Sequence, residues 1–97
     1  MLHTVNKSPF SHSGLETCLR FAGEGDVILL LEDGVLAAVS DTSRSALIEE
    51  ALKTIPVYAI DADVQARGLE KLIDGVKLAS YADFVALLEG HVSQAWL

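Results

Sequence analysis

Short apolar runs separated by polar turns recur along this chain, and they predict four β-strands. Leu2–Val5 is a brief apolar stretch that ends at a polar turn containing Pro9. Val27–Leu31 is apolar at every position, which is typical of a strand covered by helices on both faces of a parallel sheet. Val57–Ile60 and Val76–Ala79 are the third and fourth predicted strands.

Apolar side chains at helical spacing predict helices between these strands. After the first strand, Ser13 and Glu16 have the spacing of a capping box, in which each side chain accepts from an otherwise unpaired backbone N–H. The helix that follows presents one apolar face at the spacing i, i+3, i+4 and i+7. That face consists of Leu15, Cys18, Leu19 and Ala22.

The second half of the chain continues this alternation. Leu47–Ile55 repeats at helical spacing until Pro56, with Glu49 and Lys53 placed for an i, i+4 ion pair. Asp61 is a natural N-cap for a short helix that ends at Gly68. A second capping box, Ser80 with Asp83, begins a final helix whose apolar face holds Phe84, Leu87 and Leu88.

Strands that alternate with helices predict an α/β fold in which a mainly parallel sheet lies between helical layers. A length of 97 residues leaves room for one domain, so residues 1–97 are expected to form a single unit. The sequence leaves the structure of one segment and the role of one residue undecided. Val35–Val39 is either a short helix or a buried turn, and Trp96 either packs back on the domain or anchors a partner.

Composition adds a constraint on partners. Hydrophobic residues make up 51% of the chain before its seven glycines are counted, which is more than a small domain readily buries in its own core. Either the core is unusually dense or part of this surface meets a partner, and Val35–Val39 and Trp96 are the candidates for such contacts. Fourteen acidic and seven scattered basic residues give a charge of −7, which argues against direct binding of nucleic acid or an anionic membrane.

The single cysteine excludes an internal disulfide, and a reducing compartment is the simpler expectation. The longest apolar run, Val27–Leu31, is far shorter than the roughly 20 residues of a membrane span. The first residues also lack the apolar core of a signal peptide. We therefore expect a cytoplasmic protein.

Cys18 and a set of carboxylates are the candidate chemical groups. Cys18 lies on an apolar helix face, so a buried structural thiol is the first interpretation and a reactive thiol the second. The carboxylates follow two predicted strands, where open α/β sheets bind ligands, and could together hold a divalent cation. Turns and helix caps account for all of them, however, and are the favoured interpretation. The carboxylates are Glu32, Asp33, Asp61 and Asp63.

Several segments, taken in order, resemble the DsrH/TusB family over nearly the whole chain. They are MLHTVNKSPF, LETCLRFAGEGDVILLLEDGVLAAV, VYAIDADVQARGL, YADFVALL and SQAWL. No single motif is diagnostic, but the ordered set is specific. The resemblance implies a three-layer α/β/α domain with a sheet of four to five strands.

The same resemblance implies a function. Family members are the third kind of subunit in a heterohexamer with sister chains of the DsrE/TusD and DsrF/TusC types. These complexes exchange persulfide sulfur with sulfur-carrier proteins. The Tus branch serves 2-thiolation of the tRNA wobble uridine and the Dsr branch intracellular sulfur oxidation. No cofactor or metal is expected, and the chain is either non-catalytic or accessory.

The resemblance also bears on Cys18. DsrH-type chains carry a cysteine on the first helix in a setting like that of Cys18, whereas TusB-type chains often lack it. Cys18 therefore favours a DsrH-like chain and is the candidate secondary persulfide carrier. The alternative from another class is a stand-alone acidic binding or signalling domain with a divalent cation at the strand ends. Such receiver-like domains also need a lysine at a late strand end, a position that Lys77 does not occupy.

Overall fold

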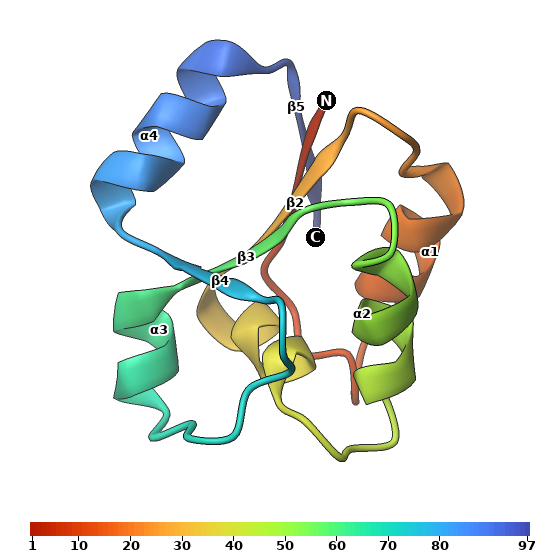
Figure 1. Ribbon diagram of the computed structural model, residues 1–97, viewed down its shortest axis with the longest axis vertical. Coiled ribbons are helices and arrows are strands. Elements are labelled where there is room, and N and C mark those ends of the chain that lie inside the picture. The colour runs from red at the N-terminus through yellow and green to blue at the C-terminus, as the bar shows by residue number, and fades with distance from the viewer.

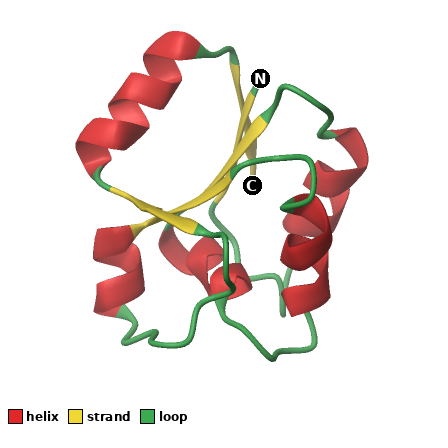
Figure 2. Cartoon of the chain, in the orientation of Figure 1, coloured by secondary structure: helices red, strands yellow, loops and turns green.

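The computed structural model describes residues 1–97, and its centre is a sheet of five parallel strands (Figures 1 and 2). The strands lie in the order β4-β3-β2-β1-β5, and every neighbouring pair runs parallel. Their bounds are β1 Leu2–Val5, β2 Val27–Leu30, β3 Val57–Ile60, β4 Lys77–Ala79 and β5 Ser93–Trp96. The predicted α/β class with a mainly parallel sheet is confirmed.

Helices cover both faces of this sheet. On one face lie α1 (Gly14–Phe21), α2 (Ser45–Ala51) and the 3-10 helix η1 (Glu32–Ala38). α3 (Asp61–Ala66) follows β3 and contacts η1. The other face carries α4 (Tyr81–Gly90), which stands apart from the remaining helices (Figure 1). No helix is long and apolar enough to span a membrane.

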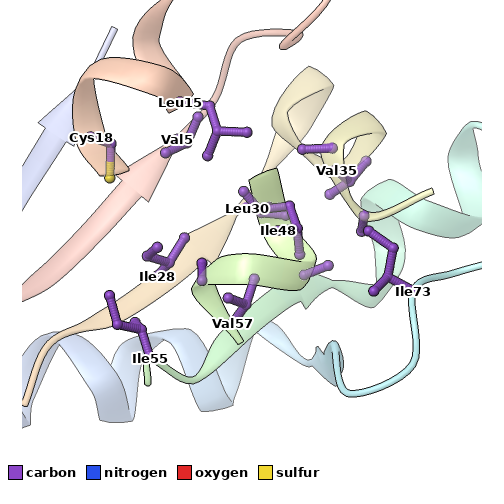
Figure 3. Packing of buried hydrophobic residues seen from close by; sticks show 14 of the residues in the cluster. Val5, Leu15, Cys18, Ile28, Leu30, Val35, Ile48, Ile55, Val57 and Ile73 are labelled. Carbon is purple, nitrogen blue, oxygen red and sulfur yellow. The ribbon is translucent and has the colours of Figure 1, made fainter. Parts of the chain in front are cut away.

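Strand register divides the apolar side chains between two cores. Leu2 pairs with Val27 and His3 with Ile28, so successive residues of β1 and β2 point to opposite faces. The larger core contains Ile28 and Leu30 with side chains from α1, α2, η1 and α3 (Figure 3). The smaller core, under α4, is formed by Leu2, Val27, Leu29, Ile60 and Ala79. Every residue of β2 is buried, as the continuous apolar run predicts.

The fifth strand lies in the C-terminal tail, which the apolar pattern leaves unassigned. β5 pairs with β1, so that Val5 lies opposite Trp96 at the edge of the sheet. Three of its four residues are exposed. An edge strand with so few buried positions has no apolar alternation to reveal it, and backbone pairing with β1 fixes its place.

Val35–Val39, left open between a helix and a turn, belongs mostly to η1. Val35, Ala37 and Ala38 are buried within this chain and are not available for subunit contacts, whereas Leu36 and Val39 are half-buried. Gly34 explains the tight fit of η1. A side-chain carbon at this position would collide with the backbone carbonyl of Val5, so η1 packs directly on the end of β1.

Three local predictions at helix ends and surfaces are also wrong. Ser13 is the N-cap of α1 but makes no side-chain capping bond; its carbonyl instead accepts from the amide and hydroxyl of Thr17, both at 3.0 Å. Asp61 is the first residue of α3, and its carboxylate accepts from Gln65 (3.2 Å) rather than capping the helix. Lys53 pairs with Glu50 at 2.9 Å, not with Glu49. These pairings depend on local rotamers that spacing alone does not determine.

The capping box at the start of α4 is confirmed. The Ser80 side chain accepts from the Asp83 amide at 3.0 Å, and the Asp83 carboxylate accepts from the Ser80 amide at 2.9 Å. Hydrogen bonds from the backbone amide of Ser80 and, to a smaller extent, from its hydroxyl hold the pKa of the Asp83 carboxyl below its ordinary value. They also fix where the chain turns from β4 into the helix that covers the second face of the sheet.

Candidate functional site

Cys18 lies in the middle of α1 and faces the larger core. Cys18 is fully buried, and Figure 3 shows its sulfur pointing from the helix toward the other core side chains. Burial, with a smaller contribution from the negative charge of Asp26, raises the pKa of the thiol to about 12. At neutral pH the sulfur is therefore protonated, whereas attack on a persulfide needs the thiolate. In this conformation Cys18 acts as a core side chain.

A hydrogen-bond network around the buried His3 links β1, β5 and the turn before β2. His3, only 2% exposed, makes a 2.9 Å contact from Nε2 to Asp26 Oδ2. Trp96 donates from Nε1 to His3 Nδ1 at 3.0 Å. Because an indole N–H only donates, Nδ1 must accept, and the neutral ring then carries its proton on Nε2 and donates to Asp26. Both ring nitrogens are satisfied by a neutral imidazole.

Asp26 is the acceptor at the other end of this network. Its Oδ2 also accepts from the Gly23 amide at 3.0 Å, and its Oδ1 lies 3.0 Å from the N-terminal ammonium of Met1. The hydrogen bond from His3, followed by those from Gly23 and the ammonium, holds the pKa of Asp26 well below its usual range. The carboxylate thus stays charged and joins the start of β1 to the turn before β2.

Trp96 packs back on the domain. Besides its bond to His3, its ring stacks on Phe21 of α1, with centroids 5.6 Å apart and planes inclined by 25°. A hollow of about 460 Å³ opens beside these rings, lined by Met1, His3, Phe21, Asp26, Gln94 and Trp96. The ring nitrogens of His3 and both carboxylate oxygens of Asp26 already have partners within the chain, so this network links the edge of the sheet to the turn before β2.

Two of the four carboxylates at the strand ends, those of Asp33 and Asp63, lie against the guanidinium of Arg67. Arg67 donates to Asp33 from both Nε (3.1 Å) and Nη2 (2.9 Å). Asp63 accepts from the Glu32 amide at 2.8 Å. No group of three or more His, Cys, Asp or Glu side chains is placed to hold a metal ion. Asp33, Asp61 and Asp63 therefore bind groups of the protein itself, and the geometry gives no support to the cation site of the alternative signalling domain.

Sequence comparison identifies the family. The family described as "DsrH like protein" matches residues 7–94. The chain belongs to the DsrH/TusB family. It is 41% identical over 98 residues to the "Protein TusB" of Klebsiella pneumoniae, covering 99% of this chain and 100% of the relative. It is 44% identical over 100 residues to the "Protein TusB" of Escherichia coli K12, covering 99% of this chain and 100% of the relative. Members of this family are parts of sulfur-relay complexes.

Solved structures agree on the fold. The crystal structure of the ychN protein from E. coli superposes with a TM-score of 0.83 at 18% identity, covering 95% of this chain and 94% of the other. The solution structure of Tm0979 from Thermotoga maritima gives a TM-score of 0.64 at 30% identity, with 94% of each chain covered. The resemblance to the DsrH/TusB family and its fold is thus confirmed.

His3 and Asp26 are the residues that sequence reasoning missed. His3 interrupts the otherwise apolar face of β1, and Asp26 directly precedes β2. A histidine inside a buried strand needs polar partners, so its position is a signal that could have been followed. Its partners are 23 and 93 residues away in the chain, however, and no local pattern connects them.

Proposed function

We propose that this chain is a subunit of a cytoplasmic sulfur-relay heterohexamer, together with sister chains of the DsrE/TusD and DsrF/TusC types. The observation that carries this proposal is full-length similarity to TusB proteins at 41–44% identity. The burial of Cys18 supports a mainly structural role, because the chain presents no exposed thiol. Its contribution is then to complete the assembly in which a sister subunit carries the persulfide.

Between the two branches of the family, the TusB relatives favour 2-thiolation of the tRNA wobble uridine. The test is complementation. A strain lacking its own TusB is supplied with this chain and its two sister chains, and 2-thiouridine in digested tRNA is measured by mass spectrometry. Restored 2-thiouridine is the expected result. Unchanged, unthiolated tRNA would contradict the assignment to this branch.

Intracellular sulfur oxidation is the second candidate, and Cys18 is the observation that favours it. The cysteine of α1 is the DsrH-like feature of this chain. Sulfite-reductase genes beside the coding sequence would support sulfur oxidation, and their absence would support tRNA thiolation. Both branches need the same assembly, so size-exclusion chromatography with light scattering of the three co-expressed chains tests their common part. A chain that stays monomeric beside its sisters would refute the proposal.

We propose Cys18 as a secondary sulfur carrier in any state of the complex that exposes it. Its thiolate would attack the terminal sulfur of a donor persulfide, forming a persulfide on Cys18 and releasing the donor thiolate. Intact mass after incubation with a persulfidated donor should then rise by the mass of one sulfur atom. The Cys18→Ser chain is the control, and an unchanged mass in the wild-type complex leaves only the structural role.

A further inference from the structure

The outer edge of β5 is a row of unpaired backbone groups. β5 is the last strand of the sheet on its side and pairs only with β1. The amide of Leu2 donates to the carbonyl of Val92 at 2.8 Å, and successive residues of a strand turn their backbone groups to opposite sides. The backbone groups of Gln94 therefore face β1, whereas those of Ser93 and Ala95 point away from the sheet.

The side chain of Gln94 agrees with this direction. It donates from Nε2 to the carbonyl of Ala95 at 3.1 Å, on the exposed side of the strand. No backbone group of another segment bonds to Ser93 or Ala95 on that side. Ser93, Gln94 and Ala95 are all exposed. The edge is therefore open to pairing with a further strand.

The two edges of the sheet differ in how they are protected. At the opposite edge, β4 has only three residues, and it carries Lys77, whose ammonium lies 5.6 Å from the centroid of the Tyr58 ring. Short strands and exposed lysines are features that keep sheet edges from pairing with other chains. β5, with the sequence SQAW, has neither a charged residue nor a proline. Its edge lacks the protection that the β4 edge has.

Exposed apolar side chains flank the β5 edge on the face that carries α1. The ring of Trp96 stacks on Phe21, yet Phe21 remains 70% exposed. Val92 directly precedes β5 and is 75% exposed. The alternation of an extended chain places Val92 on the same face as Trp96, at the other end of the strand. A strand added to this edge would lie beside both ends of this apolar row.

A second copy of this chain fits the edge in antiparallel orientation. With a two-fold axis at Gln94, Ser93 lies opposite Ala95 of the other copy, and each outward amide meets an outward carbonyl. The two Gln94 side chains then lie opposite each other and can exchange amide hydrogen bonds. Val92 lies opposite Trp96 of the other copy, where it covers exposed aromatic surface. The contact is the same from both sides, as a two-fold interface requires.

The neighbouring register fits less well. A two-fold axis at Ala95 would set the amide of Gln94 against the ring of Trp96 and would leave Val92 uncovered. The net charge of the chain does not oppose the pairing, because β5 itself is uncharged. Asp26, which lines the hollow beside the edge, lies against the ammonium of Met1. More distant acids are screened over about 8 Å at physiological salt.

We infer that two copies of this chain associate through their β5 edges, antiparallel about a two-fold axis at Gln94, so that their sheets join into one. The inference goes beyond the proposed function, because it needs no sister chain. The strand of each copy supplies the backbone partners that Ser93 and Ala95 of the other lack, and Val92 of each packs beside Phe21 and Trp96 of the other.

The test is sedimentation equilibrium of the isolated chain at about 0.15 M salt, where a reversible dimer is expected. Gln94→Lys and Gln94→Glu each place like charges opposite each other, and each should raise the dissociation constant of the dimer at least about 10-fold. An equimolar mixture of the two variants should form a heterodimer, because unlike charges then face each other. A loss of folding at position 94 would not be reversed by mixing.

A change in the backbone tests the pairing directly. Ala95→Pro removes the outward amide without removing a bond to β1, and it should also weaken the dimer at least about 10-fold. Ala95→Ser is the matched control, because it keeps the amide and should dimerise like the wild type. Circular dichroism, at a concentration where every chain is monomeric, should give the same spectrum for all variants.

The outcomes separate this inference from the proposed function. A wild-type chain that stays monomeric up to about 1 mM overturns the inference. A dimer that no Gln94 or Ala95 variant weakens, or mixed Gln94 variants that dimerise no better than either alone, overturns it too. A monomeric wild type whose binding to the purified sister chains is lost in Ala95→Pro overturns the choice of a second copy. A dimeric wild type that binds neither sister supports the β5 contact and overturns the proposed function.

Discussion

The fully buried Cys18 should react far more slowly in the folded chain than in the unfolded chain. Burial raises its pKa from 9.0 to about 12. At pH 7.5, below both values, a difference of three pKa units lowers the thiolate fraction about 1000-fold. The more basic thiolate is intrinsically more nucleophilic, which at a Brønsted coefficient of 0.4–0.5 recovers a factor of about 16–32. Ionisation alone therefore slows the reaction about 30–60-fold.

Burial slows the reaction further, because a reagent reaches Cys18 only when α1 opens away from the core. The measurement is the rate of iodoacetamide alkylation, followed by intact mass, for the folded chain at pH 7.5 and for the chain in guanidinium at the same pH. The Cys18→Ser chain gives the background. A folded-state rate within about threefold of the unfolded rate would refute the assignment of Cys18 to the core. Repeating the measurement on the assembled complex tests whether the partners expose the thiol.

Three further predictions concern stability. Gly34→Ala should destabilise the chain by at least about 2 kcal/mol in urea unfolding, because the added methyl group collides with the Val5 carbonyl. Trp96→Phe keeps the apolar ring but leaves the buried Nδ1 of His3 without a donor, and should cost about 1–3 kcal/mol by the same assay. In Asp26→Asn, stability should fall less than in the wild type as the pH is lowered into the acid range. Because folding lowers the pKa of this carboxylate, the ionised group stabilises the folded chain at pH values above 3.8, its ordinary pKa. The wild type loses this stability as the pH falls below 3.8.

Each of these changes has a control and a result that would contradict it. Gly23→Ala is matched to Gly34→Ala, since a side-chain carbon at Gly23 meets nothing within 4 Å. If both glycine variants unfold at the same urea concentration, the close contact of η1 with β1 is wrong. An unchanged midpoint for Trp96→Phe would contradict the bond to His3. For Asp26→Asn, the thermal midpoint is measured between about pH 3 and 7. If it depends on pH as the wild-type midpoint does, the stabilising role of the Asp26 network is contradicted.

Some helices and strands could be predicted from the sequence, and others could not. The continuous apolar run of β2 and the helical spacing of apolar side chains in α1 predicted both elements and their burial, because each pattern is local in the sequence. The Ser80 capping box was likewise local. β5 escaped prediction because an exposed edge strand has no apolar alternation. Lys53 pairs with Glu50, three residues before it, rather than with Glu49, four residues before it, and spacing alone does not decide between the two.

The candidate site divides in the same way. Cys18 could be placed on an apolar helix face from spacing, but the degree of its burial depends on how α1 packs on the sheet. The acids at the strand ends were correctly placed after β2 and β3, yet their partner Arg67 lies on another segment and takes Asp33 out of any cation site. The sequence could predict that acids following β2 and β3 lie at the same edge of the parallel sheet. It could not predict that the guanidinium of Arg67 binds Asp33 and Asp63 there.

The amino-acid sequence by itself determined the α/β class, four of the five strands, the helix that carries Cys18 and the family. These properties reside in local periodicity and in the ordered set of segments. Only the tertiary structure decided that His3, Asp26 and Trp96 form one network and that Gly34 packs on the end of β1. It alone showed that the outer edge of β5 stays unpaired. These features join residues far apart in the chain, and their energies arise from contacts that exist only after the sheet has assembled.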